Sequence, residues 1–109
     1  MARKKRRQVR RRWLNLPEHH STGFIRTTAE TSRWRIKETG KRYARVDCGA
    51  SIGDCGRQIH LDFDFEINQK GERDNAYRKI NMLIQMLLDL KSEMQEREAE
   101  SIAYIQSKD

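Results

Sequence analysis

Residues 75–94 hold the largest concentration of apolar side chains in the sequence, and this segment constrains the fold most. Its apolar residues recur at spacings of three and four, at Ile80, Leu83, Ile84, Leu87, Leu90 and Met94. Such spacing places them on one face of an α-helix, and neither glycine nor proline occurs from residue 75 onward. We therefore predict a long helix with Asp74 as its N-cap, whose apolar face needs another element to cover it.

A thinner apolar stripe, at Met82 and Met86, lies on a second flank of this helix. One interpretation is a core helix with a wide apolar face, which is common on helices that cover small sheets. The other is a surface that binds a partner protein, or that pairs with a second copy of the chain to give a homodimer. We favour the core interpretation and leave the second one open.

Residues 58–67 alternate strictly between apolar and polar types. The odd positions from Ile59 to Ile67 are apolar, and the even positions from His60 to Glu66 are polar or charged. Alternation with a period of two over this length is specific for a strand with one buried face. The segment is the strongest strand prediction in the chain.

Three shorter strands are predicted at residues 23–28, 33–37 and 42–48, from their β-branched and aromatic content or their alternation. Between the last two, Glu38-Thr39-Gly40-Lys41 should form a hairpin turn in which Gly40 takes a positive φ. Residues 49–56 contain three glycines and are predicted to be a loop. The fold class that follows is α+β, with a small antiparallel sheet of three to four strands packed against one long C-terminal helix. The predicted core residues of the sheet are Ile25, Trp34, Ile36, Val46, Leu61, Phe63 and Phe65.

The positive charge of the chain is concentrated at its N-terminus. The formal net charge is +7 and residues 1–12 contribute +8 of it, so the remaining residues carry −1. A segment so poor in apolar residues cannot bury a core, so we predict a disordered basic arm at residues 1–12 and a single domain at residues 13–109. Trp13 and Leu16 should anchor the arm, with Pro17 fixing the chain direction.

The basic arm is the strongest functional signal, because clustered cations neutralise phosphates and release their counterions. Arginine outnumbers lysine in it, which favours forked contacts to phosphate or to base edges. The arm residues that we assign to this contact are Arg3, Lys4, Lys5, Arg6, Arg7, Arg10, Arg11 and Arg12. The alternatives are a solvated tail, a localisation signal, or a segment that binds an acidic protein surface.

A second basic surface is expected on the outward face of the sheet, at Arg33, Arg35, Tyr43 and Arg45. Arginines beside an aromatic ring can contact a groove of a nucleic acid or stack on a base. However, three carboxylates of the strongest strand point outward too, namely Asp62, Asp64 and Glu66. If that strand neighbours the basic one, these carboxylates form cross-strand ion pairs instead.

The same strand also offers His60, Asp62, Asp64 and Glu66 as candidates for a metal or nuclease site. Alternate residues of a strand lie about 6.5–7 Å apart, which is wide for a shared cation without further ligands. We find no Ser-His-Asp order and no cofactor fingerprint. We therefore predict a protein that is not an enzyme and that has no cofactor.

Cys48 and Cys55, with His60 and the pair His19-His20, are the candidate zinc ligands. Zinc sites usually contain a tight C-x2–4-C knuckle, whereas these cysteines are seven positions apart. In a hairpin centred on Ser51 and Ile52, the two cysteines would face each other across the strands. A reduced cysteine pair without metal is the default prediction.

No apolar run in the sequence is long enough to span a bilayer. The charged start is not followed by the hydrophobic segment of a secretory signal. We expect a cytoplasmic protein, in which both cysteines stay reduced.

The layout of the arm through Pro17, and of residues 32–46 with their turn at Gly40, resembles the arm-type DNA-binding domains at the start of phage tyrosine integrases. The strand at residues 58–67 is extra in that comparison, and no catalytic domain follows. The small size, the basic arm and the lack of a catalytic motif are also similar to small phage-encoded inhibitors, including some anti-CRISPR proteins. Neither resemblance transfers a role to an individual residue.

Two functions are predicted on these grounds. The first is a small non-enzymatic nucleic-acid-binding protein, encoded by a phage or another mobile element, that grips the phosphates of DNA or RNA with its arm. The alternative is a phage-encoded inhibitor of a host nucleic-acid-handling machine, in which Met82 and Met86 contact the protein partner.

Overall fold

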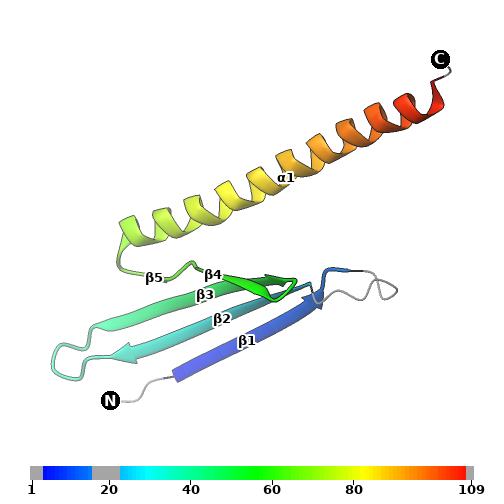
Figure 1. The fold of residues 1–109 in the computed structure, drawn as a ribbon. Helices are drawn as coiled ribbons and strands as arrows, with labels where there is room; N and C mark the ends of the chain where they lie inside the picture. Colours follow the sequence, from blue (N-terminus) through cyan, green and yellow to red (C-terminus); the bar gives the residue numbers. More distant parts are fainter. Residues whose placement is uncertain (1–3, 16–22, 108–109) are drawn as a thin grey trace. The chain divides into compact units, whose positions relative to one another are not determined.

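The computed structural model describes residues 4–15 and 23–107. An antiparallel sheet is followed by one long C-terminal helix, which confirms the predicted α+β class (Figure 1). The elements are β1 (Lys4–Trp13), β2 (Phe24–Arg35), β3 (Arg42–Asp54), β4 (Arg57–Asp62), β5 (Phe65–Glu66) and α1 (Lys70–Gln106). The chain divides into two compact units, Met1–Tyr77 and Arg78–Asp109. The predictions for Arg3, Leu16, Pro17, His19 and His20 lie outside the described residues.

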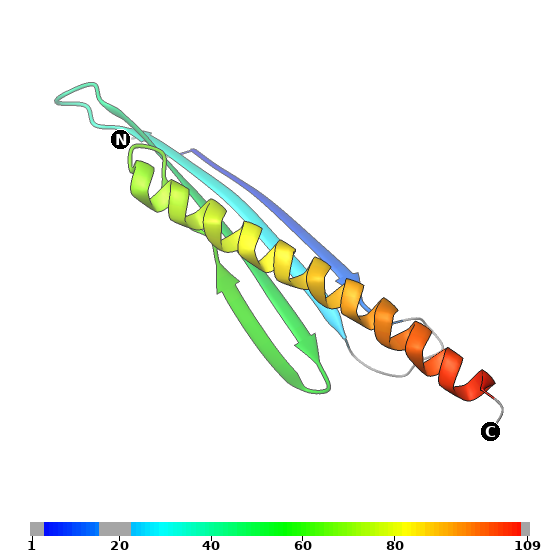
Figure 2. The same ribbon diagram turned by 90° about the horizontal axis from the view of Figure 1, so that it is seen from above.

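Most of the segment that was predicted to be a disordered arm forms strand β1. It pairs antiparallel with β2 from Lys4↔Arg33 to Trp13↔Phe24, and β2 pairs in turn with β3 (Figure 2). The backbone hydrogen bonds of a strand do not depend on its side chains, and the pleat sends successive arginines to opposite faces. A prediction from composition misses this strand, because composition shows only that the segment has few apolar residues. It does not show that β2 is available as a pairing partner.

β2 is one continuous strand that covers both segments predicted at residues 23–28 and 33–37. Residues 29–32 between them are paired with β1 on one side and with β3 on the other. The predicted turn after β2 is confirmed, since Gly40 has a φ of 70° and its N–H donates to the Ile36 carbonyl over 2.7 Å. The Ile36 N–H donates to the Lys41 carbonyl and closes the loop over 2.9 Å.

β3 continues to Asp54, so the loop predicted at residues 49–56 is wrong over most of its length. Gly53 is paired with Phe24 in the sheet, and glycine is needed at this position because a Cβ would lie 2.4 Å from the Phe24 ring. The chain reverses at Cys55 and Gly56, which have φ values of 49° and 80°. Two successive positive φ values are typical of a two-residue type I′ hairpin, which matches the twist of the flanking strands.

The strong strand predicted at residues 58–67 is present in two pieces, β4 and β5, with the same register against β3. Between them the Phe63 N–H donates to the Cys48 carbonyl over 2.8 Å, as in a regular ladder. The Cys48 N–H instead donates to the Asp64 carboxylate over 3.0 Å. The side chain of Asp64 replaces a backbone acceptor at this point and interrupts the strand.

The core of the first unit lies on one face of β3, β4 and β5. Its buried apolar residues are 5–8 % exposed and comprise Ala50, Phe63, Phe65 and Ala76. The Phe65 ring packs on the ring of Tyr77 in α1, with the two ring centroids 5.8 Å apart. Trp34 does not belong to this core, contrary to the prediction, because its register partner is Tyr43 on the opposite face.

α1 begins at Lys70, four residues before the predicted N-cap Asp74. The Glu72 carboxylate accepts the N–H of Glu66 over 3.1 Å, which ties the first turn to β5. The helix has 37 residues and a length of about 55 Å. No helix in the described part of the chain is apolar enough over a sufficient length to cross a membrane.

The second unit, described by itself, is the remainder of this helix. Its predicted stripe is present, and Leu87, Leu90 and Met94 are 53–63 % exposed. The predicted partner-binding side chains Met82 and Met86 are also exposed. A homodimer through this helix stays a prediction.

Candidate nucleic-acid interface

The register assigns each strand side chain to one of two faces, because directly paired residues project to the same side of a sheet. One face, here called the arginine face, carries Arg6, Arg10 and Arg12 of β1, Arg33 and Arg35 of β2, and Arg42 of β3. The opposite face, here called the mixed face, carries Arg7, Arg11, Arg26 and Arg45 together with Glu30, Asp47, Asp62 and Glu66.

The arginine face is a cationic surface to which the adjacent strands β1 and β2 contribute arginines but no acids. All six arginines are exposed, and in the residues that the structure describes β1 and β2 add no carboxylate to this face. None of the six forms an ion pair with another described residue. Because alternate strand residues lie about 6.6–6.8 Å apart, the arginines of β1 form a row of cations along the sheet edge.

The structure separates residues that the sequence had grouped. Arg33 and Arg35 were expected beside Tyr43 and Arg45, but they lie on opposite faces. The loop closed by Ile36 and Lys41 fixes a register in which Trp34, and not Arg33, is directly opposite Tyr43. The pleat divides the arm in the same way, so that Arg7 and Arg11 face away from Arg6 and Arg10.

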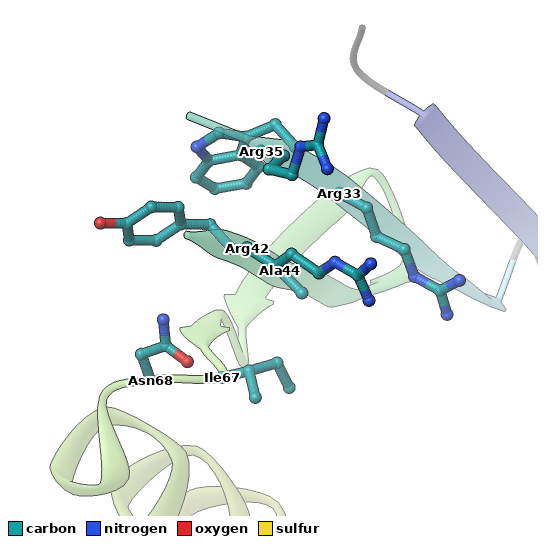
Figure 3. A pocket seen from close by; sticks show the side chains of 8 residues that line it. Arg33, Arg35, Arg42, Ala44, Ile67 and Asn68 are labelled. Carbon is teal, nitrogen blue, oxygen red and sulfur yellow. The ribbon is translucent and has the colours of Figure 1, made fainter. Parts of the chain in front are cut away.

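A pocket of about 750 Å³ lies where β2 ends and β3 begins (Figure 3). It is lined by Arg33, Trp34, Arg35, Arg42, Tyr43, Ala44, Ile67 and Asn68. Arg35 is directly opposite Arg42 on the arginine face. Trp34 and Tyr43 belong to the mixed face, and their rings are stacked with centroids 5.7 Å apart and planes inclined by 10°. The pocket thus combines guanidinium groups, aromatic and aliphatic side chains, and one amide.

The mixed face carries the cross-strand ion pair that the sequence analysis anticipated. Arg45 donates to the Asp47 carboxylate over 2.8 Å and lies 3.7 Å from that of Glu66. The hydrogen bond and the negative charge of Asp47 raise the pKa of Arg45 above its ordinary value. Arg45 is therefore less available to a phosphate than the arginines of the other face.

Trp13 is the last residue of β1 and is directly opposite Phe24, at the other end of β2 from the pocket. Its ring meets that of Phe24 edge-on, with centroids 6.5 Å apart. The Arg11 guanidinium lies 4.8 Å from the centroids of both rings. Trp13 is still 64 % exposed, so it is held by one aromatic neighbour and one cation and is not buried in the core.

A hydrogen-bonded Ser-His-Asp chain occurs on the mixed face, although the sequence analysis found no such order. Ser51 Oγ lies 2.7 Å from His60 Nδ1, and His60 Nε2 lies 2.7 Å from Asp62 Oδ1. Ser51 is only 7 % exposed and lies in β3 between two paired strands. An oxyanion site needs backbone N–H groups that are free to donate to substrate, whereas ladder pairing occupies them here. The geometry supports a cross-strand structural link.

The cysteines do not face each other. Cys48 lies within β3 and Cys55 in the turn that follows, so they are roughly 20 Å apart along an extended strand. The predicted hairpin centre at Ser51 and Ile52 is wrong, because both residues are inside β3. Among the described residues, no group of three or more His, Cys, Asp or Glu side chains is placed to hold a metal ion.

The two thiols should differ in reactivity. Burial, together with the negative charges of Asp64 and Asp47, raises the pKa of the Cys48 thiol, whereas Cys55 is exposed. Since the thiolate is the reacting form, iodoacetamide at pH 8 should modify Cys55 well before Cys48. Peptide mass spectrometry over a time course measures both rates, and equal rates would contradict the described environment of Cys48.

The comparisons with known proteins add no relative, because no protein-family model, no curated protein and no solved structure matches this chain.

Proposed function

We propose that this chain is a non-enzymatic nucleic-acid-binding protein that grips phosphates with its arginine face. The observation that carries the proposal is the set of six exposed arginines on one face of the sheet, to which β1 and β2 contribute no carboxylate in the described residues. On the mixed face, by contrast, β2 contributes Glu30, which is directly opposite Arg7 of β1 and Asp47 of β3.

Phosphate is the ligand that such a surface suits best. A guanidinium group presents a planar fork of donors that matches phosphate oxygens, and it stays charged at any physiological pH. A row of cations along an extended strand can follow a polyanion, and each neutralised phosphate releases condensed counterions. A two-stranded ribbon can also enter a major groove, so the surface fits duplex as well as single-stranded nucleic acid.

Fluorescence-anisotropy titration of the full chain tests this proposal. The ligands are single-stranded DNA, RNA and duplex DNA of equal length, each across a salt series. If five or six arginines contact phosphates of a duplex, the logarithm of the affinity should fall with the logarithm of salt concentration with a slope of about −4.5 to −5.5. Salt-independent binding, or no binding to any of the three ligands, would refute it.

The inhibitor hypothesis is retained as a second candidate because of the exposed helix flank. Met82 is 52 % exposed and Met86 is 63 % exposed, and methionine-rich surfaces adapt readily to protein partners. This alternative predicts weak binding to bare nucleic acid and tight binding to a loaded host machine. The same titration therefore separates the two candidates.

A further inference from the structure

We propose that the pocket at the end of the β2–β3 hairpin binds a single nucleotide, with its phosphate on Arg33, Arg35 and Arg42. This inference rests on the proposed function in that it names a subsite of the arginine face. The shared chemistry is a nucleobase joined to a phosphate, which a nucleic-acid strand or a free nucleotide can supply.

The first supporting observation is a pair of like charges in the sheet. Arg35 and Arg42 are directly opposite each other in the register of β2 and β3, and both are exposed. Directly opposed like charges on neighbouring strands destabilise a sheet. Arg33 precedes Arg35 by one strand repeat on the same face and adds a third cation. A bound anion would turn this repulsion into attraction.

The second observation is the size of the pocket and its apolar lining. Its volume of about 750 Å³ falls within the range of small-molecule sites, roughly 300–1,000 Å³. Ala44 and Ile67 supply apolar lining, and Ile67 is 42 % exposed. Guanidinium planes and apolar side chains are surfaces on which a flat base can stack.

Asn68 adds the polar element that could recognise a base edge. Its side-chain amide has both donor and acceptor groups, and Figure 3 shows it beside Ile67 at the pocket. The other pocket on the arginine face, lined by Arg10, Arg12, Ile25 and Thr27, is about 240 Å³. That smaller pocket has arginines but no amide.

The test is an NMR titration of the full chain with adenosine 5′-monophosphate, inorganic phosphate and adenosine in turn. We expect the nucleotide to bind at least about tenfold more tightly than either fragment, because it engages both parts of the pocket. Arg42→Gln should weaken nucleotide binding at least about tenfold. Arg26→Gln also removes one of two directly opposed arginines, but on the mixed face, and should leave nucleotide binding within about twofold.

A six-residue single-stranded oligonucleotide identifies the source of the nucleotide. Sensitivity of its binding to Arg42→Gln would place one unit of a strand in the pocket, whereas sensitivity of the monophosphate alone would indicate a free nucleotide. Equal affinity for inorganic phosphate and nucleotide, or equal effects of the two substitutions, would overturn the inference. The proposed function would survive that result if oligonucleotides still bound with a steep salt dependence.

The unfolding temperature without ligand gives an independent check. Because Arg42→Gln removes a like-charge pair, its midpoint at low salt should equal or exceed that of the unmodified chain. Adding adenosine 5′-monophosphate should raise the midpoint of the unmodified chain and not that of the variant. A lower midpoint for the variant would show that Arg42 is structural and would contradict the premise.

Discussion

Replacing Arg6, Arg10 and Arg12 by glutamine should weaken nucleic-acid binding by about 100- to 1,000-fold at roughly 0.1 M salt. These residues are the β1 part of the arginine face, and all three are exposed. Each lost phosphate contact removes one counterion-release contribution, so the salt slope on duplex DNA should become shallower by about 2.7. Anisotropy titrations of both proteins measure the two quantities together.

The matched control removes the same charge from the other face. Arg7, Arg11 and Arg26 all lie on the mixed face, and Arg7 is directly opposite Glu30. Replacing these three by glutamine should change affinity by less than about tenfold, because their side chains project away from the arginine face. If the two triple variants lost affinity equally, net charge and not the arginine face would determine binding.

Phe65→Ala should lower the free energy of unfolding of the sheet unit by about 3–5 kcal/mol. Phe65 is 8 % exposed, packs on Tyr77 and lies directly opposite Val46. Removing the ring leaves a cavity and unties the start of α1 from β5. Typical domains have stabilities of about 5–15 kcal/mol, so this loss would remove a large share.

Urea unfolding followed by tryptophan fluorescence measures this loss, because both tryptophans lie in the sheet, in β1 and β2. Ile59→Ala is the control on the same face, since Ile59 is 57 % exposed. It should lower the free energy of unfolding by less than about 1 kcal/mol. Similar losses in the two variants would show that Phe65 is not part of the core.

The sequence predicts the elements whose signals are local. The turn at Gly40 is recognisable because a positive φ favours glycine, and α1 because its apolar residues follow the helical repeat. Residues 58–67 are recognisable from alternation alone, although Asp64 interrupts the strand. Each of these predictions depends on interactions within a few residues along the chain.

The features that were missed depend on partners distant in sequence. β1 looks disordered in isolation and becomes a strand only because β2 offers it an edge. Gly53 looks like a loop residue, but it is a strand residue that makes room for the Phe24 ring. Both cases require knowledge of which strands are neighbours.

The division of the basic residues between two faces of the sheet also depends on partners distant in sequence. The sequence shows which residues are basic, whereas the register of β2 and β3 determines which face each of them is on. That register is set by the length of the loop between Ile36 and Lys41. Treating Trp34 as a core residue placed Arg33 and Arg35 beside Arg45, and the observed pairing reverses this assignment.

The most direct test of the arginine face is an NMR titration of the full chain that follows arginine Nε–Hε signals on adding a single-stranded oligonucleotide. Signals of Arg6, Arg10, Arg12, Arg33, Arg35 and Arg42 should shift strongly and together. Signals of Arg7, Arg11, Arg26 and Arg45, on the opposite face, should shift little. Equal shifts on both faces, or shifts confined to the mixed face, would contradict the proposal that the arginine face is the binding surface.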